Sequence, residues 1–520
     1  MASRTGEITR ITTGGIAVAI CVAMMCMAPL AAVFLRANGA AFAPSDAATI
    51  RFTVAQAAVS AAVSVLLAVP VARALARRQF AGRSLLISLL GAPFLVPVIV
   101  AVLGLLQLFG RASVLNSGLA SFGLPPISIY GLHGVVLAHV FFNLPLAVRM
   151  ILQGWQAIPA ERFRVAASLD FAPADLLRHL ERPMLREVLP GAALVIFTLC
   201  LSSFAVALTL GGGPGATTVE LAIYQALRFD FDLGRAALLS AIQFGLCAVA
   251  AVASLRFAQQ TGFGAGLGRL AVPWWGLTPW SAVRDFVAIL MATLFLILPL
   301  ALLVPRGLGG MADVPMAVFP ALARSLAIAG LSATLTLVAA LLLANAIVRG
   351  PFARTMELTG MLPLAASSLV LGTGLFLIVR PWAVPEQVSL PVTALVNATL
   401  ALPFALRLLL PAMRRVETDY GRLATSLALT GLARWRWLIL PRLRAPLGFT
   451  AGLIAALSIG DLGVVALFAG ERGVTLPLLV QRLMGAYQMD AAAAVALVLV
   501  GSSFGVFLVL DWQGRRHADA

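Results

Sequence analysis

A polar, arginine-bearing segment occurs twice in this chain, once in each half and at a fixed separation. The first copy spans residues 164–185 and reads RVAASLDFAPADLLRHLERPML, and the second spans residues 422–443 and reads RLATSLALTGLARWRWLILPRL. An offset of 258 residues aligns identical residues in the two copies, namely Ala166 with Ala424, Ser168 with Ser426, Leu169 with Leu427 and Pro183 with Pro441. Both copies lie between long apolar stretches. The chain is therefore a tandem duplication, and its two halves must fold in the same way.

Apolar residues are too abundant for a soluble domain to bury. They make up 61% of the chain against 11% charged residues, with a mean hydropathy of +0.99, which is typical of a polytopic membrane protein. Twelve runs, six in each half, are long enough for a helix to cross a hydrocarbon layer of ~30 Å. They cover residues 11–35, 52–72, 84–110, 130–148, 188–211, 236–255, 286–305, 325–348, 358–378, 388–406, 445–468 and 491–510. Because these runs are continuously apolar rather than alternating, we expect an all-α membrane protein of two homologous six-helix bundles.

The domain boundaries follow from the repeat and from a change in composition between the halves. We expect a first half at residues 1–258 and a second half at residues 284–520, joined by a linker at residues 259–283 that is rich in Gly, Pro and Trp. Glycine gives a linker flexibility and tryptophan favours the headgroup level, so this linker should lie on the membrane surface. The duplicated polar loops cover about residues 156–186 and 414–444, and they are called the first and second polar loops below.

Arginine placement predicts the orientation of the spans. The chain contains no lysine, so all 37 basic residues are arginines. Twelve spans with a cytoplasmic N-terminus place both polar loops, the arginines of residues 73–83 and both termini on the cytoplasmic side, where basic residues are favoured. The first apolar run, about 25 residues long, is expected to be a retained anchor rather than a cleaved leader. The net charge of +16 is explained by contacts with membrane lipid and needs no nucleic-acid partner.

Several kinds of chemistry are excluded by what the chain lacks. Without lysine no G-x-x-x-x-G-K-[ST] phosphate loop can form, so the glycine-rich residues 211–218 are not a nucleotide site of that type. The four cysteines and four histidines lack the spacing of zinc or redox motifs. The sequence also offers no carboxylate pair or Cys/His dyad of a membrane-embedded enzyme. We therefore expect no catalytic site, metal or cofactor in this chain.

The polar loops are predicted to form a helix, a turn and another helix. In the first loop Pro159 and Glu161 suit a helix start, and the segment Phe171-Ala172-Pro173 breaks the helix before a second run. Small residues at Ala166, Ala167 and Ala424 would let the helix approach a partner surface closely, with arginines at the rim. The alternative is a solvated loop whose arginines only set the topology. That alternative does not explain why two distant loops share a spaced sequence.

The polar loops resemble the EAA loop of binding-protein-dependent ABC transporter permeases, whose pattern is E-A-A, three residues, Gly, nine residues and I-x-L-P. The family's positions are occupied in the first loop by Arg164, Val165, Ala166, Asp170, Leu180 and Pro183, and in the second by Arg422, Leu423, Ala424, Ala428, Leu438, Leu440 and Pro441. The resemblance implies that each loop is a coupling helix docking into a groove on an ATPase subunit. The implied sites also include Ala167, Ser168 and Leu169, and Ser426, Leu427 and Gly431.

The two loops depart from the family pattern at the turn. Asp170 and Ala428 stand where the family has glycine. Aspartate tolerates the left-handed conformation that glycine would supply, whereas alanine does so poorly. We therefore expect Gly431 to relocate the turn of the second loop.

Four further segments, at residues 139–149, 203–232, 458–468 and 475–497, extend the resemblance over nearly the full chain. They look like the fused permeases of thiamine and thiamine pyrophosphate importers. That family implies alternating access of two bundles in a bacterial inner membrane, driven by two copies of a separate ABC ATPase that bind ATP and magnesium, after delivery by a periplasmic substrate-binding protein.

Two alternatives stay open at this point. Fused permeases of ferric-iron importers share the two-times-six layout and similar Gly-rich and D-x-G stretches. A secondary transporter could also contain twelve spans in two repeats. It is less favoured, because ion-coupled carriers usually need several ionisable groups inside the membrane, and here almost none occur apart from Asp461 and His139.

Asp461 is the acidic residue expected well inside a span, and its repeat counterpart is Ser203. A buried carboxylate is costly, so it could line a pathway for a cationic substrate. Equally, it could break the eleventh span and cap the segment that follows. Further pathway candidates are Gln107, Asn143, Gln243 and Asn397, whose alternative role is interhelical hydrogen bonding.

The loops at residues 211–232 and 470–490 align by repeat, pairing Thr217 with Thr475 and Asp232 with Asp490. We expect them to face a periplasmic binding protein. The candidate contact residues are Thr217, Tyr224, Gln225, Thr475 and Tyr487. The alternative is ordinary loop punctuation by Gly and Pro.

Overall fold

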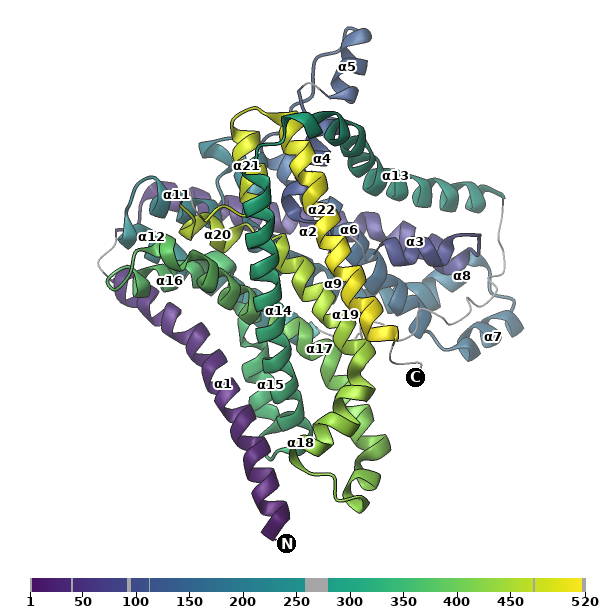
Figure 1. The fold of residues 1–520 in the computed structure, drawn as a ribbon. Helices are drawn as coiled ribbons and strands as arrows, with labels where there is room; N and C mark the ends of the chain where they lie inside the picture. Colours follow the sequence, from purple (N-terminus) through teal and green to yellow (C-terminus); the bar gives the residue numbers. More distant parts are fainter. Residues whose placement is uncertain are drawn as a thin grey trace.

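The computed structural model describes residues 2–38, 41–90, 95–111, 113–257, 279–470 and 473–516. All regular structure in these ranges is helical, which confirms the expected all-α class (Figure 1). Most of the expected linker, residues 259–278, lies outside the described residues.

The described residues contain eleven helical segments long and apolar enough to cross a membrane, and a bent helix pair makes a twelfth. Each coincides with one of the twelve expected runs. The helices of the first-half spans are α1 (Ala2–Ala37), α2 (Pro44–Arg77), α4 (Val98–Phe109) with α5 (Val114–Ser121), α6 (Leu132–Ala157), α9 (Arg182–Leu201) and α12 (Leu233–Phe257). Those of the second half are α13 (Pro279–Gly309), α14 (Val318–Arg349), α15 (Ala353–Met361) with α16 (Ser368–Val379), α17 (Ser389–Ser426), α19 (Leu440–Ile459) with α20 (Gly463–Phe468), and α22 (Met489–Arg516).

The ninth span is broken, and the expectation of one continuous helix at residues 358–378 was wrong. α15 and the short η5 (Leu362–Ala365) meet α16 at an angle of 93°. Pro363 has no N–H to continue the helix, and the Ser367 hydroxyl caps α16 by accepting from the Val370 backbone N–H at 3.1 Å. In the first half α3 (Arg83–Leu89) and α4 are likewise separate helices, with Pro97 at the N-cap of α4.

Short helices repeat between the halves as the spans do. α7 (Ala160–Ser168), α8 (Pro173–Leu176), η2 (Leu177–Glu181), α10 (Phe204–Leu210) and α11 (Val219–Arg228) in the first half match the end of α17, α18 (Gly431–Arg434), η7 (Trp435–Ile439), α20 and α21 (Leu476–Gly485) in the second. The offset is 270 residues at the starts of α4 and α16 but 258 in the polar loops. The first half therefore carries an insertion, which includes α5 at the top of Figure 1.

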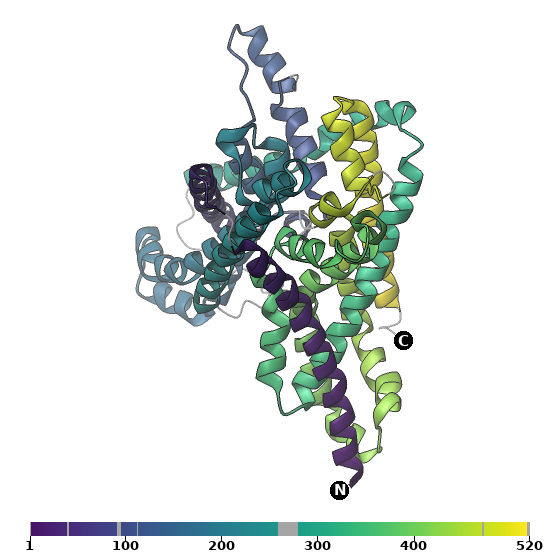
Figure 2. The same cartoon turned by 90° about the vertical axis from the view of Figure 1, so that its left-hand side faces the viewer.

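The first helix of each half packs against the other half. α1 lies along α14 and α16, and α13 lies along α2 and α4; Figure 2 shows α1 crossing the second-half helices. Each crossing has a glycine against a proline carbonyl. A Cβ placed on Gly374 would lie 2.3 Å from the Pro29 oxygen, and one placed on Gly104 would lie 2.8 Å from the Pro299 oxygen. Because these two contacts are related by the repeat offset of 270, the crossed packing belongs to the duplicated design.

Candidate functional site

The two polar loops share one backbone conformation. α7 ends in a Schellman turn in which Phe171 N–H donates to the Ala166 carbonyl at 3.0 Å, and Leu429 N–H donates to the Ala424 carbonyl at 2.9 Å in the second loop. The left-handed residue is Asp170 in the first loop and Ala428 in the second, each with φ of 51°. The expectation that Gly431 would relocate the second turn was wrong. Gly431 is also left-handed, with φ of 53°, but the turn stays at Ala428 because the paired backbone hydrogen bonds hold it there.

The side chains that the polar loops expose differ from those expected. Ala166 and Ala424 are 3% and 2% exposed, so they pack inward and cannot face a partner. The residues beside them do face outward. Val165 and Leu423 are 56% and 55% exposed, and Leu169 and Leu427 are both 61% exposed. Each loop thus presents the same pair of apolar side chains at nearly the same exposure, on α7 at the right of Figure 1 and at the C-terminal end of α17.

The remaining residues of the predicted coupling loops lie on both faces. Leu438 is buried, Leu180 is half-buried and Pro183 is exposed. The other exposed members are Arg164, Ser168, Asp170, Arg422, Ser426, Ala428 and Gly431, while Ala167 and Pro441 are half-buried.

A π-helical turn follows each polar loop at the same repeat position. In η2 the Arg182 N–H donates to the Leu177 carbonyl, and in η7 the Leu440 N–H donates to the Trp435 carbonyl. Pro183 and Pro441 come directly afterwards. Proline cannot donate to the carbonyl four residues earlier and its ring clashes with that group, so widening the turn relieves the clash. The proline of the family pattern therefore has a structural effect in both halves.

Buried ion pairs tie the polar loops to the bundles. Arg73 on α2 pairs with Glu181 at 2.6 Å, and the Glu181 side chain is 1% exposed. In the second loop Arg434 pairs with Glu417 at 2.5 Å, and the Arg434 side chain is 4% exposed. These pairs let a force applied to either loop act on the spans behind it.

We expect Glu417→Gln to lower the free energy of unfolding by about 2 kcal/mol, because it leaves the buried Arg434 guanidinium without its carboxylate. The measurement is the midpoint of thermal unfolding in detergent. Glu357→Gln is the matched control, since Glu357 pairs with Arg414 where both side chains are exposed, and such pairs contribute little. Equal midpoints for the two variants would contradict a structural role for the buried pair.

The predicted pathway residues have separate partners, with one exception. Gln107 accepts from Arg306 at 2.6 Å, Asn143 donates to the His139 carbonyl at 2.8 Å, and Gln243 donates to the Leu201 carbonyl at 2.8 Å. Ser203 occupies the N-cap position of α10 without a side-chain capping bond. Only Asn397 and Asp461 are brought together, by a side-chain hydrogen bond.

Asn397 belongs to a polar triad inside the second half that has a counterpart in the first. Asn397 donates to Ser458 at 3.0 Å, and Ser458 donates to Ser332 at 3.0 Å. At the repeat-related positions of the first half, His139 Nδ1 lies 3.2 Å from the Ser60 hydroxyl, next to Cys200. These groups are buried between helices of one half, which supports the alternative role of interhelical hydrogen bonding.

Asp461 lies in the break between α19 and α20. Its Oδ1 accepts from the Gly463 backbone N–H at 3.3 Å, which supports the capping role. Its Oδ2 is buried and has no hydrogen-bond partner in the described part of the chain. The capping contact therefore leaves half of the carboxylate unexplained.

The outer loops differ from the expected alignment by one or two residues. Thr218, rather than Thr217, matches Thr475, because these two residues are the N-caps of α11 and α21. The Val219 N–H is held by Thr53 at 2.9 Å, and a serine on α14 holds the matching N–H of α21. The offset shrinks to 257 here, and to 256 at α12 and α22. The proposed pairing of Asp232 with Asp490 was therefore wrong.

Exposed aromatic residues mark the hairpins that follow α11 and α21. Phe231 and Tyr487 are 77% and 88% exposed, with φ of 53° and 60°. The left-handed backbone in bulky residues costs energy and points to a functional constraint. Phe231 was missed from the sequence because the repeat alignment was displaced. Gln225 is exposed, whereas Tyr224 packs on Phe204 at 5.2 Å; burial raises the pKa of Tyr224, and the charges of Arg228 and Arg482 oppose the rise.

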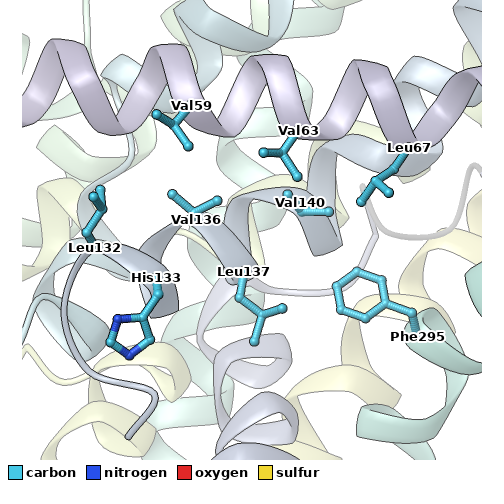
Figure 3. A pocket seen from close by; sticks show the side chains of 9 residues that line it. All are labelled: Val59, Val63, Leu67, Leu132, His133, Val136, Leu137, Val140 and Phe295. Atoms are coloured by element: carbon cyan, nitrogen blue, oxygen red, sulfur yellow. The ribbon is translucent and has the colours of Figure 1, made fainter.

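A cavity of about 490 Å³ lies between α2, α6 and α13 (Figure 3). It is lined by Val59, Val63, Leu67, Leu132, His133, Val136, Leu137, Val140 and Phe295. None of the predicted pathway residues lines it. Since its walls offer no carboxylate, this cavity has no counter-charge for a cationic substrate.

Comparison with known proteins gives full-length relatives of one kind. No protein-family model matches the chain. The chain is 38% identical over 495 residues to the thiamine transport system permease protein ThiP of Salmonella typhimurium (strain LT2), covering 90% of this chain and 89% of that protein. It is 36% identical over 537 residues to the protein of the same description from Brucella abortus (strain 2308), covering 98% and 97%. The corresponding Escherichia coli (strain K12) protein is 37% identical over 486 residues, covering 90% and 89%.

Proposed function

The chain belongs to the thiamine transport permease family of ABC importers, and on this premise we propose that it carries thiamine inward while separate ATPase subunits supply the energy. The similarity to thiamine permeases over 90–98% of the chain carries this conclusion. None of these relatives is a ferric-iron permease, so the ferric-iron alternative has no support. A transporter rather than an enzyme also fits the lack of catalytic motifs in the sequence.

Two copies of an ABC ATPase subunit dock on the two polar loops in this proposal. Support comes from the apolar pairs Val165 with Leu169 and Leu423 with Leu427, whose exposure is matched across the repeat. Six spans separate the loops, an even number, so both loops lie on the same membrane face. ATP and magnesium are bound by these partner subunits, and this chain contributes no cofactor site.

We assign the polar loops and both termini to the cytoplasmic side of a bacterial inner membrane. The arginine-rich loops support this orientation through the positive-inside rule. A periplasmic substrate-binding protein would then meet the opposite face, where Phe231 and Tyr487 are exposed at repeat-related hairpins. Membrane lipid surrounds the apolar faces of the spans.

The test is transport by the reconstituted complex. Proteoliposomes that hold the chain, its ATPase and its binding protein should accumulate labelled thiamine only when ATP is supplied, and the chain alone should hydrolyse no ATP. Parallel assays with thiamine pyrophosphate and ferric iron define the substrate range. ATP-dependent uptake of ferric iron without uptake of thiamine would contradict the proposal.

A further inference from the structure

Two carboxylates that form no ion pair within the described residues lie beside the start of α16. One is Glu220 on α11, from the first half, and the other is Asp461 between α19 and α20, from the second half. α11 packs against both α16 and α20. The two acids therefore approach one helix end from opposite halves of the molecule.

Glu220 is fully buried, at 0% exposure. Its Oε1 accepts from Gln243 at 3.0 Å, and the Ser367 hydroxyl at the N-cap of α16 is its neighbour from the other half. Its Oε2 is buried and has no hydrogen-bond partner. A carboxylate that is buried without a cation is costly, and a membrane protein keeps such a group where it has a function.

Asp461 approaches the same helix end through Gly463. Its Oδ1 accepts from the Gly463 N–H, and a Cβ on Gly463 would lie 2.5 Å from the Ser368 hydroxyl. Gly460, next to Asp461, packs against Pro97 at the start of α4 in the first half, at 3.1 Å from a Cβ placed on the glycine. Asp461 therefore also lies where the two halves meet.

The position suits a site that opens and closes during transport. The N-terminus of α16 favours negative charge nearby, which keeps two acids close together without a permanent cation. Because Glu220 and Ser367 belong to different halves, relative movement of the halves separates them and frees the carboxylate. A cation that enters the gap then meets acceptors, including Glu220 Oε2 and Asp461 Oδ2, that have no partner in the described structure.

We propose that Glu220 and Asp461 form a binding station for the cationic thiazolium ring of the substrate between the two halves. This inference rests on thiamine being the substrate. A thiazolium ring carries a delocalised positive charge, which two carboxylates neutralise at close range in an apolar environment. The station supplies charge selection inside the membrane, where the spans offer few other ionisable groups.

The experiment compares initial uptake of labelled thiamine in proteoliposomes containing the ATPase and binding protein. The variants Glu220→Gln and Asp461→Asn keep the size and the acceptor oxygen of each side chain but remove its charge. Uptake per assembled complex should fall at least tenfold in each, with ATPase co-purification unchanged. Asp313→Asn is the matched control, since Asp313 is an exposed carboxylate in η4 (Gly310–Asp313), and it should transport like the wild type.

Charge-retaining variants separate recognition from structure. Glu220→Asp should transport better than Glu220→Gln under the proposal, whereas a purely structural role predicts that the shorter side chain is as harmful or worse. Uptake by both neutral variants at the wild-type rate overturns the station but leaves the proposed function intact. Absence of thiamine uptake by the wild type overturns the proposed function itself. If Glu220→Gln does not assemble, Asp461→Asn alone decides, and full uptake by that variant overturns the proposal.

Discussion

Replacing Leu169 and Leu427 together by aspartate should abolish co-purification of the ATPase subunits while the chain still inserts and folds. Both leucines are 61% exposed at the tips of the polar loops, so removing them disturbs no core. Burying a leucine in an interface contributes about 1.5–3 kcal/mol, and an aspartate there adds a desolvation cost. Since 1.4 kcal/mol is tenfold in affinity, each site should lose roughly 100-fold or more.

The single variants and one control sharpen this test. Leu169→Asp and Leu427→Asp alone should each leave one intact docking site, so the complex should retain about half of its bound ATPase. Leu124→Asp is the control, because Leu124 is also an exposed leucine, at 53%, but lies beside the inserted α5 without a repeat counterpart. Normal ATPase binding by the double variant would remove the polar loops as docking sites.

Replacing Gly374 or Gly104 by leucine should have the second large effect, on folding rather than on docking. The added Cβ would lie 2.3 Å from the Pro29 carbonyl oxygen in the first case and 2.8 Å from that of Pro299 in the second. Backbone atoms cannot rotate away as a side chain can, so α1 or α13 must shift as a whole. We expect a loss of about 3 kcal/mol or more, with Gly374→Leu the more severe.

The measurement is the yield and thermal midpoint of monodisperse protein after extraction in detergent. Gly330→Leu is the matched control, because Gly330 lies within α14 and a Cβ there has no neighbour within 4 Å. A midpoint for Gly374→Leu equal to that of Gly330→Leu would show that the crossed packing contributes nothing to stability.

The helical architecture could be predicted from the sequence because both of its signals are strong and local. Long apolar runs identify spans, and two copies of one spaced motif identify a duplication. The break in the ninth span was not predicted, because hydropathy over residues 358–378 does not register where Pro363 and Ser367 end one helix and start another. Apolar content gives the presence of a span but not its straightness.

The site was predicted less completely, for three physical reasons. Alternating small and large residues on α7 do not reveal which face packs inward, so Ala166 was assigned the wrong side. The cost of a left-handed alanine suggested a displaced turn, but the Schellman hydrogen bonds outweigh that cost at Ala428. Glu220 was missed because its repeat counterpart is Pro477, and because it lies next to a loop rather than within an apolar run.

The crossing of α1 onto the second half also has a consequence for how the molecule is made. Pro29 leaves the ribosome early, but its partner Gly374 is synthesised roughly 345 residues later, which at typical elongation rates takes about 20 to 70 s. During that interval the first bundle sits in the membrane with one flank of its leading helix uncovered. Biogenesis therefore depends on keeping an unfinished protein from associating with its neighbours, and the fused gene product ensures that the missing surface arrives on the same polypeptide.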